Sequence, residues 1–211
     1  MTSQMFSLFL SAFVTFFVII DPPGCAPIFA GLTGGTNAAH RRAMALRSTM
    51  VAGIILFAFA LIGEPLLRTL GISLDAFRIA GGIMLFLIAL EMVFEKRTQK
   101  REGRAKAVAE NSAEYDDISI FPMAMPMIAG PGSIASAMLL TQRSHGLIAH
   151  VVVLAALGAV LLVLLVSLLA AGPLMKLIGH KIEAVITRLL GVLLAALAAQ
   201  FVIDGIRASF V

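Results

Sequence analysis

Charged residues are scarce in this 211-residue sequence: Asp, Glu, Lys and Arg make up 13% of it, against about 25% in a soluble domain. Hydrophobic residues make up 60%, and the mean hydropathy is +1.00. A water-soluble fold of this size could not hide so much apolar surface. Cysteine is also scarce, since Cys25 stands alone and cannot form an internal disulfide. The composition therefore excludes soluble enzymes, disordered chains and disulfide scaffolds.

The remaining feature of the composition is a basic balance, with a net charge of +4 and an isoelectric point near 9.7. Taken alone, this balance would suggest a nucleic-acid partner. Most of the charges, however, lie in short segments between apolar runs, where they indicate membrane topology. We therefore expect contact with membrane lipid and no nucleic-acid partner.

Continuous apolar runs of membrane length predict helices, because a membrane barrel would show alternating segments of about ten residues. Six such runs are present, and the first and fourth are interrupted by Gly and Pro. The N-terminus lacks the basic start and the cleavage site of a signal peptide, so the first run is expected to be a retained helix. The six runs are about Met5–Thr33, Ala43–Gly63, Ala76–Phe94, Ile118–Thr141, Gly146–Ala171 and Ala184–Ile206.

The basic residues divide unequally between the two sides of such a membrane protein. Loops and helix ends after the first, third and fifth helices hold twelve Lys and Arg, and the other side holds four. The positive-inside rule then places the first side in the cytoplasm and both termini outside. The polar stretch Glu95–Asp117 is expected to be a solvated cytoplasmic connector, with contact to anionic lipid or a partner as the alternative.

The two halves of the chain resemble each other at a shift of 108 residues. Pro23-Gly24 falls on Pro131-Gly132, and Pro65-Leu66 falls on Pro173-Leu174. Each repeat holds three helices, so the second copy enters the membrane from the opposite side. The prediction is an all-α membrane protein of six transmembrane helices, built as two inverted three-helix repeats (1–97 and 118–211) joined by a polar connector (98–117). Many secondary transporters use this architecture.

The interruptions in the first and fourth helices occupy equivalent positions in the two repeats. Asp21-Pro22-Pro23-Gly24 and Gly130-Pro131-Gly132 should each break a helix, because proline lacks an N–H and clashes with the preceding turn. A break leaves unpaired N–H groups, about Gly24–Ile28 and Gly132–Ser136, and unpaired carbonyls before them. The N–H ends suit an anion and the carbonyl ends suit a cation, so a small zwitterion would satisfy both.

Candidate substrate-binding residues follow from this hypothesis. Asp21 lies inside an apolar run and is a functional candidate, although it could equally serve only to cap the second half-helix. Gln200 is expected to bond inside the bundle, whereas Glu91 and Asp204 are expected to reach the interface. Close helix crossing is expected at Gly81, Gly82 and Gly191. The full candidate set is Asp21, Pro23, Gly24, Cys25, Gly130, Gly132, Ser133, Ser136 and Gln200; no catalytic or metal-ligating residue is proposed.

Four motifs occur in order along the chain: Asp21–Gly24 with Pro27 and Phe29; Phe77–Gly82; Pro122, Ala124, Pro126 and Gly130–Ile134; and Gln200-Phe201 with Asp204–Ile206. Together they resemble the MarC family of integral membrane proteins over essentially the whole chain. The resemblance implies a six-helix protein of the bacterial inner membrane, with both termini then in the periplasm, grouped with transporters of small neutral amino acids such as alanine and glycine. One departure is Cys25, where the family usually has Asn; a thiol offers weaker hydrogen bonds than an amide, which puts specificity and coupling in doubt.

The favoured function is therefore secondary transport of a small zwitterionic amino acid, by alternating access around a central site between the two broken helices. The alternative is a transporter or channel for another small solute or ion. An intramembrane enzyme is a distant third, because the four histidines lie in loops or at helix ends and no HExxH or GxSxG pattern occurs. No cofactor is expected, the coupling ion is left open between H⁺ and Na⁺, and so are homo-oligomerisation and transport direction.

Overall fold

The computed structural model describes residues 2–94, 99–100, 102–103, 117–144 and 146–210, with only the backbone described at 2–3, 143 and 173–183. The protein is all-helical, and no strand occurs among these residues. Most of the expected connector 98–117 lies outside them. The elements are α1 (Thr2–Ile20), α2 (Pro22–Leu32), α3 (Ala38–Thr69), α4 (Leu74–Val93), the irregular helix η1 (Ser119–Ile128), α6 (Pro131–Arg143), α7 (Leu147–Leu169) and α8 (Ala171–Ser209).

Short polar side chains begin two of the long helices. Asn37 accepts a hydrogen bond from the N–H of His40 (2.8 Å) at the start of α3, and Ser73 accepts one from Ala76 (3.1 Å) at the start of α4. Each satisfies an N–H that has no partner within its helix.

The interruptions are narrower than expected, and two helices are longer. Only Asp21 separates α1 from α2, because Pro22 and Pro23 lie at the first positions of α2, where a missing N–H costs nothing. The helix α3 continues past Gly63 and through Pro65 to Thr69. The last helix was expected at Ala184–Ile206, but α8 begins at Ala171, directly after the single residue Ala170 that follows α7.

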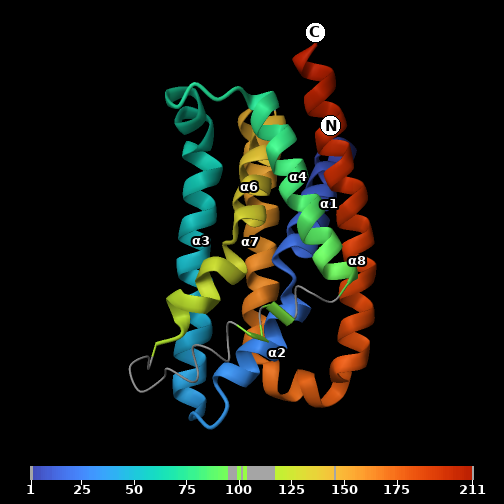
Figure 1. The fold of residues 1–211 in the computed structure, drawn as a ribbon. Coiled ribbons are helices and arrows are strands. Elements are labelled where there is room, and N and C mark those ends of the chain that lie inside the picture. The colour runs from blue at the N-terminus through green and yellow to red at the C-terminus, as the bar shows by residue number, and fades with distance from the viewer. Residues whose placement is uncertain (1, 95–98, 101, 104–116, 145, 211) are drawn as a thin grey trace.

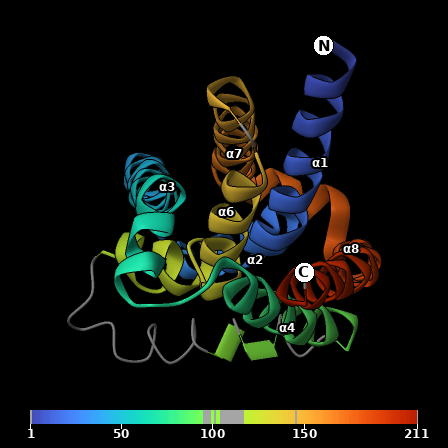
Figure 2. The same ribbon diagram turned by 90° about the horizontal axis from the view of Figure 1, so that it is seen from above.

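The short helices α2 and α6 lie in the middle of the molecule when it is viewed along the bundle (Figure 2). The helix α1 packs against α7, while α3 packs against η1, α6 and α7. The most extensive contact is between α4 and α8. The two termini lie at the same end of the bundle (Figure 1), which agrees with an even number of crossings.

Glycines make the crossing between α4 and α8 close. A Cβ added at Gly82 would lie 2.9 Å from the carbonyl oxygen of Ala198, and one at Gly191 would lie 2.8 Å from the Cβ of Met92. A Cβ at Gly81 would approach Leu139 of α6 to 2.9 Å. The expectation of close crossing at these three glycines is confirmed.

Five helical segments of the described chain are long and apolar enough to cross a membrane, or six if η1 and α6, bent by 55° at their junction, form one segment. The outer surface of these helices is apolar, as membrane lipid requires. Large exposed hydrophobic side chains include Met50, Ile54 and Leu61 on α3, Leu162 and Val166 on α7, and Leu189 and Val192 on α8.

Candidate functional site

The junction between α1 and α2 is closed by its own residues. Asp21 is 1% exposed and adopts the left-handed conformation (φ 60°, ψ 64°). Its Oδ1 accepts the N–H of Gly24 at 3.1 Å, and its carbonyl accepts the N–H of Cys25 at 3.0 Å. A Cβ at Gly24 would lie 2.2 Å from Asp21 Oδ2, so this cap requires glycine. The capping role considered for Asp21 is present, and the N–H of Gly24 is bonded within the protein.

The equivalent junction before α6 is built differently. Phe121 and Met125, each preceding a proline, leave helical geometry inside η1. Gly130 then takes the N-cap position of α6 and supplies no side-chain cap, so the first turn begins with Pro131 and the N–H groups of Gly132 and Ser133. The start of a helix carries a partial positive charge.

This start of α6 faces a cavity of about 310 Å³ between α4, η1 and α6, which we name the Glu91 cavity. Glu91 on α4 and Lys100 meet there as an ion pair. Gly132 lets α6 approach α4 here, because a Cβ would meet the Cδ1 of Ile88 at 2.5 Å. The cavity is lined by Ile19, Met84, Leu87, Ile88, Glu91, Lys100, Pro126, Met127, Gly130, Pro131, Gly132 and Ser133.

Three of the sequence candidates, Gly130, Gly132 and Ser133, therefore line one cavity. Glu91 also lines this cavity but is not among the sequence candidates, because its place near the end of an apolar run suggested that it reaches the interface. The signal that could have found it is a carboxylate within a membrane-length helix, which is a functional candidate by default. The cavity thus joins the positive end of a helix to a carboxylate.

Other candidates lie outside the lining of this cavity. Cys25 is fully buried, and its Sγ donates to the carbonyl of Ile20 at 3.5 Å, one of the carbonyls that the end of α1 leaves free. Ser136 is fully buried one turn beyond Ser133, and its Oγ has no hydrogen-bond partner among the described residues. Pro23 is half-buried in the first turn of α2.

Gln200 does not bond inside the bundle as expected. It is exposed on α8, and its Nε2 donates to Asp204 Oδ1 at 2.6 Å, one turn along the same helix. The physical reason is the register of α8, in which Ala198 and Phe201, on either side of Gln200, are the residues that point inward.

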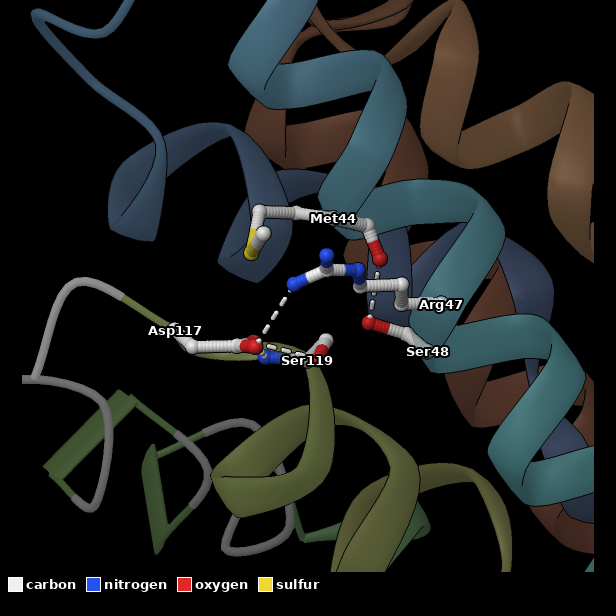
Figure 3. A network of polar contacts seen from close by, with 5 residues as sticks. All are labelled: Met44, Arg47, Ser48, Asp117 and Ser119. Carbon is white, nitrogen blue, oxygen red and sulfur yellow. Dashed lines mark hydrogen bonds and ion pairs between the residues drawn. The ribbon is translucent and has the colours of Figure 1, made fainter.

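An ion pair ties the start of η1 to α3 (Figure 3). Arg47 donates to Asp117 Oδ2 at 3.0 Å, and the N–H of Ser119 donates to Asp117 Oδ1 at 2.9 Å. The Ser119 hydroxyl donates to the same oxygen. These bonds from Ser119, with a smaller contribution from Arg47, lower the pKa of Asp117 below its ordinary value of 3.8. The pair anchors the polypeptide where it enters η1.

The apolar outer surface, the membrane-length helices and the buried interrupted segments define a multi-pass helical membrane protein. The chain belongs to the MarC family of integral membrane proteins, whose profile matches residues 6–210.

Relatives span nearly the whole chain. A UPF0056 membrane protein of Methanocaldococcus jannaschii is 38% identical over 94% of this chain and 96% of its own length. One of Archaeoglobus fulgidus is 33% identical over 97% of this chain and 95% of its own. The UPF0056 inner membrane protein YhgN of Escherichia coli is 33% identical over 94% of this chain and 95% of its own. No solved structure matches the chain.

Proposed function

We propose that this protein is a secondary transporter of small neutral amino acids in a bacterial inner membrane, and that the Glu91 cavity is its substrate site. The observation that carries the proposal is the pairing of the uncapped start of α6 with a carboxylate in one cavity. The N–H groups of Gly132 and Ser133 suit a substrate carboxylate. Glu91 suits the ammonium group. A volume of about 310 Å³ is at the small end for ligand sites, as a small amino acid requires.

Lys100 has a specific role in this proposal. Its ammonium occupies the place on Glu91 that the substrate's ammonium would take. The Lys100 side chain therefore competes with the substrate, and its withdrawal accompanies binding.

We also propose that the two halves are inverted repeats and that each interrupted pair, α1/α2 and η1/α6, is one broken membrane segment. The same hydrogen bonds, from a side-chain hydroxyl to a backbone carbonyl, occur at positions 108 residues apart in the two halves. Thr33 donates to the carbonyl of Phe29 and Thr141 to that of Ala137, both at 2.7 Å. The next hydroxyls repeat the pattern, since Thr36 donates to the carbonyl of Thr33 (2.9 Å) and Ser144 to that of Thr141 (2.8 Å).

The packing of elements supports the same two-fold relation. In the two repeats, α1 corresponds to η1, α2 to α6, α3 to α7 and α4 to α8. A two-fold relation therefore predicts that the contacts α1·α7, α2·α7 and α2·α8 have the counterparts η1·α3, α6·α3 and α6·α4. All six contacts occur. The helices α2 and α6, which lie in the middle of the bundle (Figure 2), belong to opposite repeats. Discontinuous helices at the interface between repeats are where transporters with alternating access typically bind their substrates.

Two further cavities are related by the shift of 108. One, of about 360 Å³, lies where α2 ends, α3 begins and α7 ends; the other, of about 510 Å³, lies where α3 ends, α6 ends and α7 begins. We name them the Arg42 cavity and the Gln142 cavity. Thr33, Arg42, Leu168, Leu169 and Gly172 line the first, and their equivalents Thr141, His150, Ala60, Leu61 and Glu64 line the second. Paired vestibules at opposite ends suit alternating access.

Uptake of labelled L-alanine into proteoliposomes tests the proposal. Glu91→Gln removes the charge that holds the ammonium and should raise KM about 10- to 100-fold, because a hydrogen bond to a charged group contributes about 1.5–3 kcal/mol. Lys100→Met removes the competitor and should lower KM. Asp204→Asn is the matched control, because Asp204 lies on α8, outside the cavity lining, and bonds to Gln200; its KM should stay unchanged.

The outcomes separate the alternatives. An unchanged KM in both Glu91→Gln and Lys100→Met would reject the Glu91 cavity as the substrate site. Absence of alanine and glycine flux in either direction would reject amino-acid transport. Flux of another small solute would then favour the alternative transporter or channel.

A further inference from the structure

Two arginines near the start of α3, Arg41 and Arg42, line the Arg42 cavity together with residues from the end of α2 and the end of α7. Both arginines are exposed, and no ion pair between described residues includes either of them. The lining that the structure describes holds no acidic residue. The cavity therefore presents two positive charges that no carboxylate of its lining balances.

The start of α3 makes this concentration of positive charge unfavourable for the protein alone. Asn37 caps the helix, but the first turn of α3 holds no acidic residue. The start of a helix carries a partial positive charge, which repels nearby cations and attracts anions. An anion in the cavity would interact favourably with the helix start and with both guanidinium groups, whose planar geometry suits a phosphate.

The equivalent cavity at the other end of the bundle, the Gln142 cavity, has a different charge arrangement. At the shift of 108, Arg42 corresponds to His150. The arginine that lines the Gln142 cavity, Arg68, lies 2.6 Å from Glu64 Oε1 and is therefore neutralised by an ion pair. The repeated helices thus do not require two arginines at this place, and the unbalanced positive charge belongs to one end of the bundle.

Exposed apolar side chains continue from the Arg42 cavity along two of its helices. On α3, Leu46 and Met50 follow Arg42 at intervals of four residues and lie on the same side of the helix. On α7, Leu169 lines the cavity, and Val166 lies on the same side one turn before it. A phospholipid with a negative headgroup has the matching arrangement, because its charged phosphate is followed by acyl chains. A free anion would make no use of the apolar surface.

We propose that the Arg42 cavity binds the phosphate headgroup of an anionic phospholipid, whose acyl chains lie along α3 and α7. The start of α3 and the junction of α7 with α8 lie at the end of the bundle opposite the termini (Figure 1), where the basic residues predict the cytoplasmic side. Anionic lipid is found in the cytoplasmic leaflet, and basic pockets between membrane helices bind its headgroups. The volume of about 360 Å³ is at the small end of the range for organic ligands. The site stands on its own lining and does not rest on transport.

Native mass spectrometry of the full chain measures the lipid preference directly. The protein is released from micelles that contain equal amounts of dioleoylphosphatidylglycerol, which is anionic, and dioleoylphosphatidylcholine, which is zwitterionic and has the same chains. The wild type should retain the anionic lipid preferentially. The double variant Arg41→Gln/Arg42→Gln should reduce this preference about 25-fold, because each arginine near an anionic headgroup contributes a gain in affinity of about fivefold.

A double variant with the same loss of net charge is the matched control. Arg47→Gln/Arg68→Gln removes two exposed arginines that lie outside the Arg42 cavity and pair with Asp117 and Glu64, so it should keep the wild-type preference. Free glycerol phosphate at the same concentration should not displace the lipid, because it lacks acyl chains. Equal loss of preference in both double variants, equal retention of the two lipids by the wild type, or displacement by glycerol phosphate would overturn the proposal.

Discussion

Substitutions of Asp21 separate two contributions to the stability of the junction between α1 and α2, the side-chain cap and the left-handed backbone conformation. Asp21 contributes a side-chain acceptor for the N–H of Gly24 and adopts a left-handed backbone conformation. Asparagine keeps an acceptor and tolerates this conformation. Glycine tolerates the conformation but loses the acceptor, and alanine loses both. The series Asn, Gly, Ala therefore removes one term at a time.

The magnitudes follow from these two terms. Loss of a cap costs about 1 kcal/mol, and holding a residue with a Cβ in the left-handed conformation costs about 1–2 kcal/mol. Asp21→Gly should lower the free energy of unfolding by about 1 kcal/mol, and Asp21→Ala by about 2–3 kcal/mol. Asp21→Asn should be the mildest of the three. The gap between Gly and Ala is the sharpest quantity, because both variants lose the carboxylate and only alanine strains the left-handed backbone.

Reversible unfolding in mixed micelles measures these differences. Equal destabilisation by Gly and Ala would refute the left-handed conformation of Asp21, and an Asn variant as unstable as Ala would refute the cap. Transport by the folded Asn variant then decides between the two roles considered for Asp21. Wild-type transport is expected if Asp21 only caps α2, and loss of transport if its charge contacts substrate or coupling ion.

Two further predictions concern packing and pH. Gly82→Ala should destabilise the protein by about 1–3 kcal/mol, because its Cβ would meet backbone of α8. Its control Gly31→Ala, with nothing within 4 Å, should be neutral or stabilising; equal effects in an unfolding assay would contradict the close crossing. The lowered pKa of Asp117 means that its hydrogen bonds from Ser119, with a smaller contribution from Arg47, stabilise the folded state above pH 3.8, and that this contribution is lost as the pH falls through the folded pKa. The stability of wild type should therefore exceed that of Asp117→Asn above pH 3.8 and converge with it below, by a small, salt-sensitive amount because both partners are exposed; a difference that grows in acid would contradict the sign.

The membrane class, the helical content and the glycine crossings could be predicted, because apolar run length and small residues act locally and leave a pattern in sequence. The residues at which each interruption begins and ends could not be predicted. Two prolines after Asp21 suggest a wide break, but proline fits the first turn of a helix, and the break shrinks to one residue.

The lining of the Glu91 cavity was predicted only in part. Gly130, Gly132 and Ser133 follow from a Gly/Pro interruption, whereas Glu91 lines the same cavity because of how α4 packs against η1 and α6. Gln200 illustrates the same limit, since its polarity inside an apolar run suggested burial, but its helical register turns it outward. Which side of a helix meets its neighbours is a tertiary property that uniformly apolar helices do not encode.

Counterflow in proteoliposomes tests the central claim most directly, because it reports a carrier without requiring knowledge of the coupling ion. Vesicles loaded with unlabelled L-alanine are diluted into a trace of labelled L-alanine. Transient accumulation of label above equilibrium is predicted for the wild type, with accumulation strongly reduced in Glu91→Gln and retained in Asp204→Asn. Simple equilibration without overshoot in the wild type, or equal overshoot in Glu91→Gln, would contradict the account.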